Sequence, residues 1–402
     1  MSARLEYPAR VHIELARRLT GPEGAEAVAA AEALPDPDSL AAAEAMRAAF
    51  DPELAAAALT QAGLRARARR RMGPGAARLW WTPDSVEQAS RPAVSRWRAA
   101  RLVAAGITRV VDLACGAGVD ALACLDAGLD VTAVDIDPAT AEFAARNLPG
   151  ARVLCADATR VGADLTAGAD GRTAVLLDPA RRTARGRSWR LADLRPGWGF
   201  VQDVLAGPTS AVVRLGPGAP AEALPEAAEA VWVSEHHELV ECGLWRIPGA
   251  GPGRAAQLLP SGALVRAEPD APAPPVRAPG RYILEPDPAV SRAGASAAIA
   301  PGLWRLAERV AYLSCDEPVH GPLADCFEVL EELDAGPAAL RAWVRAHRVG
   351  VLEIKKRALD LDPAQLRRRL RPSGPNRATL LLSPTTGGAR AFIVRRLERP
   401  AP

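Results

Sequence analysis

The sequence predicts an α/β fold in which helices cover a mostly parallel sheet, with a helical region before it and a basic α+β region after it. From about residue 79, short apolar runs alternate with helical patterns, which is typical of βαβ units around a buried parallel sheet. The charge is also segregated along the chain. Residues 337–402 hold 15 Lys and Arg against four Asp and Glu, a net charge of +11; since the whole chain carries +3, the remainder carries −8. A basic end on an acidic body favours a polyanionic partner.

Composition limits the class of protein. The 402 residues are enough for about two to four domains. The hydrophobic fraction of 49% and the charged fraction of 24% are typical of a globular chain and exclude general disorder. No apolar run reaches about 18 residues, and Arg4, Glu6 and Arg10 interrupt the region where a signal peptide is apolar, so we expect neither a membrane span nor secretion. The six cysteines are scattered and form no C-x-x-C pair, which favours reduced thiols and a cytoplasmic protein.

The helical region covers residues 1–78, which are rich in alanine and predict helices over 38–48 and 51–62. Asp36 and Asp51 each precede a proline, the pattern of an N-cap with Pro in the first turn. The core that follows is expected to have helices at 93–105, 119–127, 138–147 and 198–205, and strands at 109–113, 130–135, 151–155, 173–177 and 210–215.

Two further regions follow the core. Strands at 238–246 and 255–267 are expected to close the core as an antiparallel pair, and the proline-rich segment 270–279 is expected to be a linker. After it we expect strand 282–284, helix 288–298, strand 309–313, helix 338–347, strand 349–355, helix 363–370, and strands 378–382 and 390–396. We therefore divide the chain into a helical region at 1–78, a core domain at 79–269, a small segment at 280–325 and a C-terminal domain at 326–400.

The sharpest functional signal is a glycine-containing loop after the first core strand. Asp112 ends that strand, and Ala114 and Cys115 follow it. Gly116 and Gly118 allow a tight turn and close approach of a ligand. The helix that begins after Gly118 offers unpaired N–H groups to that ligand.

Two more acidic residues follow the next two strands. Asp135, with Ile136 after it, ends the second strand, where a carboxylate can accept hydrogen bonds from both hydroxyls of an adenosine ribose. Asp157, with Ala158 after it, follows the third strand and can accept from the exocyclic amine of adenine. Together with the loop, these four residues make up the predicted cofactor site.

Two classes of cofactor compete for this loop. Gly116, Gly118 and Ala121 also fit the dinucleotide pattern G-x-G-x-x-G/A, with Asp135 about 20 residues further on. A dinucleotide, however, brings a diphosphate that Asp112 would repel. A carboxylate there suits the amino group and the sulfonium of S-adenosylmethionine, and the extra acid Asp157 favours the same ligand. We expect S-adenosylmethionine, with NAD(P) and an oxidoreductase as the alternative.

The segment from Asp112 to Gly118 resembles the first motif of class I S-adenosylmethionine-dependent methyltransferases, with Ala114 where that motif commonly has glycine. Other segments are similar to bacterial methyltransferases with a THUMP-like domain, namely LDPARR at 177–182, YILEPDP at 282–288, YLSCDEP at 312–318 and LEIKKR at 352–357. The likeness spans roughly residues 80–396. It implies a Rossmann-like class I core with a mostly parallel seven-stranded sheet, a ferredoxin-like segment at 280–325 and an α+β THUMP-like domain at 326–400. It also implies that Asp135 binds the ribose and Asp157 the adenine, and that the partner is RNA (tRNA or rRNA).

A second motif follows the fourth strand, where class I enzymes carry the acceptor side. Asp178 and Pro179 resemble the Asn/Asp-Pro-Pro-aromatic motif of amino methyltransferases, whose oxygens orient the amine, but Arg181 stands in place of the aromatic residue. The motif is closer to the Asp-Pro-Pro-Arg motif of RNA uridine-C5 methyltransferases, which need a cysteine nucleophile. We predict Asp178, Pro179 and Arg181 as the catalytic residues; the alternative for Asp178 is a helix cap or turn residue.

Two other candidates are weaker. Cys315 superficially suits the nucleophile, but it lies beyond the linker and outside the core, so we expect a buried structural cysteine. The run from Glu235 to Glu238 contains His236 and His237, whose side chains would alternate in a strand. No third ligand is identifiable, so we expect no metal.

The RNA surface is expected in the C-terminal domain, where one helix separates an apolar face from a face of arginines. The predicted contacts are Arg341, Arg345, Arg348, Lys355, Lys356, Arg357 and the run 367–369; the basic run 65–71 is either a solvated helix face or a second contact. We therefore expect an S-adenosylmethionine-dependent methyltransferase (EC 2.1.1.-) acting on RNA. The alternatives are a small-molecule methyltransferase, an NAD(P)-dependent oxidoreductase and a non-catalytic RNA-binding protein. Nothing in the sequence indicates the oligomeric state.

Overall fold

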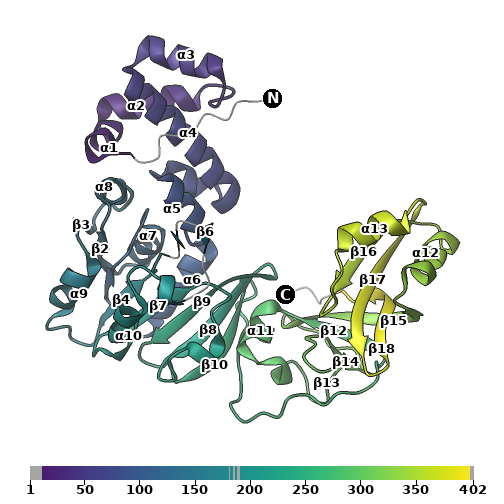
Figure 1. Ribbon diagram of the computed structural model, residues 1–402. Helices are drawn as coiled ribbons and strands as arrows, with labels where there is room; N and C mark the ends of the chain where they lie inside the picture. Colours follow the sequence, from purple (N-terminus) through teal and green to yellow (C-terminus); the bar gives the residue numbers. More distant parts are fainter. Residues whose placement is uncertain (1–10, 181, 184–185, 188–190, 399–402) are drawn as a thin grey trace. The chain divides into compact units, whose positions relative to one another are not determined.

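The computed structural model describes residues 11–180, 182–183, 186–187 and 191–398 (Figure 1). The chain divides into two compact units. The first comprises Met1–Ala228 and Gly243–Gly251, and the second comprises Glu229–Cys242 and Pro252–Pro402.

Helices make up the N-terminal region of the first unit: α1 (Ile13–Thr20), α2 (Pro22–Glu32), α3 (Leu40–Ala49), α4 (Pro52–Met72) and the short 3-10 helix η1 (Pro74–Arg78). Asp51 caps α4 as predicted, accepting from the N–H groups of Glu53 and Leu54 at 3.1 and 3.2 Å. Asp36 does not cap α3. That helix begins at Leu40, and Ser39 caps it by accepting from the Ala42 N–H at 3.2 Å. The predicted cap therefore lies in the turn that precedes the real one.

The basic run at the end of α4 is partly committed to the fold. Arg65 donates to the Leu79 carbonyl at 3.1 Å and stacks over the Trp80 ring. Arg71 donates to the carbonyls of Val86 and Glu87 at 3.1 and 2.7 Å. These arginines fasten α4 to the segment that leads into the sheet, and that segment contains two short helices, α5 (Pro83–Gln88) and α6 (Pro92–Ala104).

Five parallel strands form the centre of the first unit in the order β3-β2-β1-β4-β7. They are β1 (Arg109–Asp112), β2 (Asp130–Asp135), β3 (Arg152–Cys155), β4 (Thr173–Leu177) and β7 (Ser210–Leu215). The connecting helices are α7 (Val119–Asp126), α8 (Pro138–Asn147), α9 (Ala158–Thr166) and α10 (Trp198–Ala206). All five strands are confirmed to within one residue. Four of them are largely buried apolar runs, whereas β3 at the edge of the sheet is partly exposed. Helix α9 was not predicted.

The sheet continues beyond β7 with β9 (Glu238–Arg246), β8 (Glu229–Glu235), β10 (Gly253–Leu259) and β11 (Leu264–Arg266). It therefore has nine strands in place of the predicted seven. The antiparallel pairing of 238–246 with 255–267 is wrong, since β10 pairs with β8 in parallel and only β11 runs antiparallel to β10. The cause is β8, which was not predicted and which separates β9 from β10. His236 and His237 have φ of 50° and 64°, so they form the tight turn between β8 and β9 and do not lie within a strand.

A seven-stranded sheet forms the body of the second unit, in the order β13-β14-β12-β15-β18-β17-β16. Its strands are β12 (Tyr282–Pro286), β13 (Trp304–Arg305), β14 (Leu313–Cys315), β15 (Ala324–Asp334), β16 (Val349–Lys356), β17 (Asn376–Thr385) and β18 (Gly388–Arg396). The predicted strand at 309–313 is wrong except for its last residue, because Arg309 has a φ of 57°. The boundary predicted between 325 and 326 falls inside β15, so both predicted segments contribute to one sheet.

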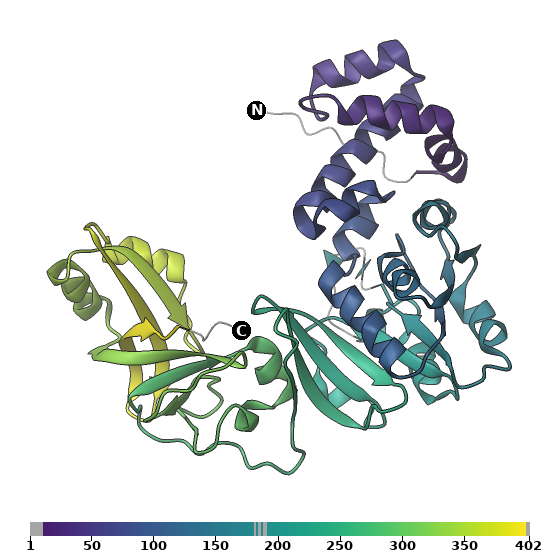
Figure 2. The same cartoon turned by 180° about the vertical axis from the view of Figure 1, so that it is seen from behind.

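Three helices accompany this sheet. Helix α11 (Pro288–Ala293) packs against β8 and β10 and ends five residues earlier than predicted, followed by the 3-10 turn η4 (Ser296–Ala298). Helices α12 (Pro337–Ala346) and α13 (Pro363–Leu370) lie side by side, and Figure 2 shows them from behind. They bury Leu340, Val344, Leu366 and Leu370 against β16, β17 and β18. Segment 270–279 has no helix or strand apart from a single bridge between Val276 and Arg305, and it lies inside the second unit. In the part of the chain that the structure describes, no helix has the length and apolar character needed to cross a membrane.

Candidate active site

A cavity of about 500 Å³ opens at the carboxyl ends of the parallel strands of the first unit. Ligands of open parallel sheets bind at this edge, because the loops that follow the strands meet there. Among the residues lining it are nine that the sequence predicted: Asp112, Ala114, Cys115, Gly116, Asp135, Ile136, Asp157, Ala158 and Asp178. Gly118 and Pro179 do not line it. Arg181 lies outside the described residues.

The glycine loop has the tight turn that its sequence predicted. Gly116 and Gly118 have φ of 55° and 82°, which favours glycine at both positions. A Cβ at Gly118 would also lie 2.8 Å from the side chain of Leu148. Gly118 therefore acts indirectly: it lets the loop pack against the residue that follows α8, and helix α7 begins directly after it.

Asp112 is the most strongly perturbed carboxyl of the cavity. It is only 4% exposed, and burial, with the nearby Asp120 carboxylate next in effect, raises its pKa well above the ordinary range. The Ala114 N–H partly offsets this by donating to it. A cationic group bound beside Asp112 would favour its charged form, so the site is suited to a positively charged ligand. Burial and the carboxylates of Asp112 and Asp135 also raise the pKa of Cys115, which keeps that thiol protonated.

Asp135 and Asp157 differ in what already binds them. Asp135 accepts from the N–H of Gly116 at 3.0 Å and of Asp137 at 2.9 Å, and burial raises its pKa. Asp157 caps α9 by accepting from the Thr159 N–H and hydroxyl at 2.9 and 2.7 Å, and these bonds lower its pKa. Asp157 thus has a structural role as well as a place in the cavity wall. Between them, Ile136 is 68% exposed and gives the cavity an apolar rim.

Four charged residues of the cavity were not predicted: Arg98, Asp120, Arg195 and Arg214. Asp120, in the first turn of α7, pairs with the buried Arg98 of α6 and accepts from the Ser90 hydroxyl at 2.7 Å. Burial acts to raise the pKa of Asp120, but Arg98 and Arg214 outweigh it, so the pKa of this carboxyl lies below its ordinary value. Arg214, on β7, lies 2.6 Å from a carboxylate oxygen of Asp178. A charged residue inside the apolar run of β7 was the one available signal for it.

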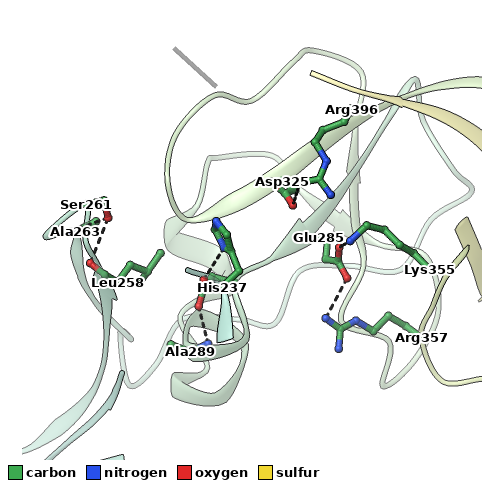
Figure 3. A network of polar contacts seen from close by, with 11 residues as sticks. His237, Leu258, Ser261, Ala263, Glu285, Ala289, Asp325, Lys355, Arg357 and Arg396 are labelled. Carbon is green, nitrogen blue, oxygen red and sulfur yellow. Dashed lines mark hydrogen bonds and ion pairs between the residues drawn. The ribbon is translucent and has the colours of Figure 1, made fainter. Parts of the chain in front are cut away.

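Two weaker candidates lie away from the cavity. Cys315 belongs to β14 of the second unit, where its thiol is 2.9 Å from the Glu317 carbonyl and burial raises its pKa to about 12. It does not line the described cavity. His237 lies 2.9 Å from the buried carboxylate of Asp287, which itself caps α11 through the Ala289 N–H, as Figure 3 shows. His237 is therefore part of the hairpin turn and of a hydrogen bond with Asp287 within the second unit.

The charge of the cavity favours one class of cofactor over the other. Five aspartates and three arginines line it, a formal charge of −2: Asp112, Asp120, Asp135, Asp157, Asp178, Arg98, Arg195 and Arg214. A diphosphate would meet repulsion here, whereas a sulfonium with an amino group would meet attraction. The donor set therefore fits S-adenosylmethionine. Asp112 would face its cationic groups, Asp135 its ribose hydroxyls, and Asp157 with Ile136 its adenine.

Comparison with known proteins agrees with the fold and with a methyltransferase. Residues 111–167 match the family described as "Methyltransferase domain", residues 324–396 match "THUMP domain-like", and residues 12–68 match a domain of unknown function, DUF8688. Two curated relatives from Mycobacterium tuberculosis, strains CDC 1551 and H37Rv, are named uncharacterized S-adenosylmethionine-dependent methyltransferases. Each is 33% identical over 336 residues, which is 81% of this chain and 90% of the relative. A crystal structure described as a "putative methyltransferase" from Porphyromonas gingivalis W83 has a TM-score of 0.75 and 22% identity, over 93% of this chain and 99% of that one.

The fold and the acidic cavity thus define a class I methyltransferase with a Rossmann-like core. The chain belongs to the S-adenosylmethionine-dependent methyltransferases that carry a THUMP-like domain. Its cofactor is S-adenosylmethionine, so the alternative of a dinucleotide oxidoreductase is set aside.

Proposed function

We propose that this methyltransferase modifies RNA and that its THUMP-like domain docks the RNA. A cluster of exposed arginines in that domain carries the proposal. The six residues, here called the arginine end, are Arg345, Arg348, Arg368, Arg369, Arg371 and Arg377. Within the described part of the chain, none of them forms an ion pair, so their charge is available to a polyanion.

The topology brings the six arginines to one end of the domain. Helices α12 and α13 each end where a strand of the parallel pair β16 and β17 begins. The two strand starts are adjacent, since the Asn376 N–H donates to the Arg348 carbonyl at 3.2 Å. A Cβ on Gly350 would lie 1.8 Å from the Gly374 carbonyl oxygen, so the connecting loops are also in close contact. Arginines in the last turns of two helices complement the helix dipoles, but six at one end exceed that need.

The structure changes which basic residues support the proposal. Lys355 and Arg357 were predicted RNA contacts, yet they bind the two oxygens of Glu285 at 2.6 and 3.2 Å, as Figure 3 shows. Glu285 therefore offsets one of these two positive charges within the domain. The RNA surface is therefore better assigned to the arginine end than to residues 355–357.

Asp178 and Pro179 stay the proposed acceptor-side residues. Asp178 follows β4 and lies in the cavity wall, with its side chain 28% exposed. Bound S-adenosylmethionine supplies a methyl group on a positively charged sulfur. The protein must then hold the acceptor atom in line with that group and exclude water, and the Asp178 carboxylate can orient a proton-bearing acceptor.

The test follows a tritiated methyl group from S-adenosylmethionine into total RNA, total protein and a metabolite extract. We expect label in RNA. Reversal of Arg348, Arg371 and Arg377 to Glu should abolish that label and reduce the salt dependence of RNA binding by about 2 in log–log slope, at about 0.7 for each phosphate that is no longer neutralised. S-adenosylmethionine affinity should not change. Label found only in small molecules or only in protein would contradict the RNA proposal.

A matched variant controls for net charge. Arg47, Arg152 and Arg309 are exposed arginines on α3, on β3 and in the loop before β14, and their reversal to Glu changes the charge equally. We expect this control to keep RNA methylation. Equal losses in both triple variants would show a general charge effect and would remove the support for the arginine end.

A further inference from the structure

Arg214 connects two parts of the active-site wall that lie far apart in the sequence. Its side chain is 15% exposed and lines the cavity. We propose that Arg214 is a positioning residue: it fixes the carboxylate of Asp178 for the acceptor and fastens residues 88–90 against the cofactor end of the cavity. The inference rests on the proposed role of Asp178 in orienting the acceptor, but not on the acceptor being RNA.

The guanidinium binds partners from different elements of the first unit. One terminal nitrogen, Nη1, lies 2.6 Å from the Asp178 carboxylate and donates to the Ser90 hydroxyl at 2.9 Å. The other, Nη2, donates to the Gln88 carbonyl at 2.7 Å. Asp178 follows β4, whereas Gln88 ends α5 and Ser90 precedes α6. One planar group therefore fixes the acceptor side and the segment opposite it, a geometry that the compact ammonium of lysine cannot reproduce.

Arg98 shows why Arg214 is not explained by charge balance alone. Both arginines line the same cavity, but Arg98 contacts Asp120 directly, while Arg214 lies 4.0 Å from that carboxylate. Asp120 is thus neutralised mainly by Arg98. The short contact of Arg214 is with Asp178, which places its chief effect at the acceptor side.

The position of Arg214 also links the two binding events. Ser90 donates to Asp120, which stands beside the glycine loop and raises the pKa of Asp112. Residues 88–90 therefore connect the acceptor carboxylate, through Arg214, to the acidic end that would hold the cofactor. Removal of Arg214 should therefore release the Asp178 carboxylate and, to a smaller degree, residues 88–90 at the cofactor end of the cavity.

A double-mutant cycle tests the acceptor part. Arg214→Met and Asp178→Asn are made singly and together, and methyl transfer is measured on whichever fraction the wild-type enzyme labels. We expect Arg214→Met to lower turnover about 100-fold, the cost of a small misplacement. If Arg214 acts through Asp178, the double variant should be no slower than Asp178→Asn alone. Additive losses, or unchanged turnover in Arg214→Met, would overturn the inference.

Calorimetry with S-adenosylhomocysteine tests whether Arg214 fastens residues 88–90, and it needs no acceptor. Arg214→Met should weaken binding about 3–10-fold, in both the wild-type and the Asp178→Asn background, because residues 88–90 lose an anchor worth a hydrogen bond. Unchanged affinity would contradict this part. Arg98→Met is the matched control, since it removes a buried arginine from the same cavity. It should show no coupling to Asp178→Asn in the turnover cycle.

Two further variants separate positioning from folding. Arg214→Lys should recover part of the turnover, because an ammonium can reach Asp178 but not all three acceptors at once. Arg214→Ala should recover turnover when guanidinium ions are added at a concentration below that which alters the melting curve. A protein that only misfolds would respond to neither. If another fraction carries label and RNA does not, the RNA proposal fails. The double-mutant cycle of Arg214→Met and Asp178→Asn can then still be measured on the labelled fraction, so the inference about Arg214 is tested separately.

Discussion

The side-chain amide of Asn147 donates to the carbonyl of Ala117 at 2.9 Å, which ties the end of α8 to the glycine loop. The same amide group donates to the Trp80 carbonyl at 2.9 Å, and its oxygen accepts from the Trp80 N–H at 2.7 Å. Asn147 is 5% exposed; its bond to Ala117 is buried and its two bonds to Trp80 are partly buried. Asn147 therefore links the cofactor loop to the segment that follows the N-terminal helices.

Asn147→Ala should lower the stability of the protein by about 2–4 kcal/mol, because it leaves buried backbone groups without partners. It should also weaken S-adenosylhomocysteine binding, since the glycine loop loses a support. Chemical denaturation and calorimetry measure the two effects. Asn376→Ala serves as control, because Asn376 bonds the His347 carbonyl in the second unit. Asn376→Ala should leave the affinity for S-adenosylhomocysteine unchanged. A loss of affinity in this control would show that the effect of Asn147→Ala does not come from the glycine loop.

Asp112 should make cofactor binding depend on pH. Its raised pKa means that part of the free protein carries a protonated Asp112, and a cationic ligand favours the charged form. Below that raised pKa, binding must release a proton, so affinity for S-adenosylmethionine should rise with pH, by at most about tenfold per unit, and level off above it. Methylthioadenosine, which lacks the cationic groups, should bind without this dependence.

Asp112→Asn should separate stability from binding. A buried acid with a raised folded-state pKa stabilises the protein below its unfolded pKa, and this contribution is lost as the pH rises through the folded pKa. Since neutral pH lies above the ordinary pKa of an aspartate, burying Asp112 costs the free protein stability at that pH. Asp112→Asn should raise the melting temperature at neutral pH while lowering S-adenosylmethionine affinity and removing its pH dependence. A lower melting temperature would show that Asp112 is needed for the fold itself.

Cys315→Ser should keep methyl transfer. The pKa of about 12 leaves a thiol at neutral pH, and the thiolate is the nucleophile in cysteine catalysis. Denaturing gels of the wild-type enzyme with labelled substrate should show no covalent adduct. Cys326→Ser, a second buried cysteine of the same sheet, should behave in the same way. A trapped adduct that disappears only in Cys315→Ser would instead establish the cysteine mechanism.

Glu285→Gln should destabilise the second unit by about 2 kcal/mol, because Lys355 and Arg357 lose a partly buried partner. Lys355→Glu should destabilise it further, by placing two carboxylates together. Thermal unfolding should show the losses, while RNA binding at low temperature should fall less than in the Arg348, Arg371 and Arg377 variant. Stronger loss of RNA binding in Lys355→Glu than in that variant would return the RNA surface to residues 355–357.

Most of the core was predictable because its signals are local. Each parallel strand is an apolar run, and the acids and glycines at the strand ends follow directly in sequence. Strand β8 was missed although it is fully apolar at its centre, since its turn to β9 is His236-His237 and lacks the glycine or asparagine of common hairpin turns. A turn of two non-glycine residues at positive φ is stabilised by the surrounding sheet. The local sequence pattern therefore does not predict it.

The cavity was predictable only in part for a related reason. Asp112, Asp135 and Asp178 belong to loops after strands, where function is expected. Arg98, Asp120 and Arg214 belong to helices and a strand, and their roles arise from contacts between residues up to 126 positions apart. Pairs of residues so far apart follow no fixed spacing in the sequence, so they can be recognised only in the structure.

The position of β15 bears on how the THUMP-like domain can be studied. The family match begins at residue 324, where β15 starts, but β15 is flanked by β12 on one side and β18 on the other. A fragment of residues 324–396 would lack β12 and would leave residues 324–328 of β15, which pair with it, as an open edge with unpaired N–H and C=O groups. Phe327, now fully buried, would lose the cover of Ile283 and Tyr312. Such a fragment should associate edge to edge, whereas one that begins before Tyr282 keeps the edge closed.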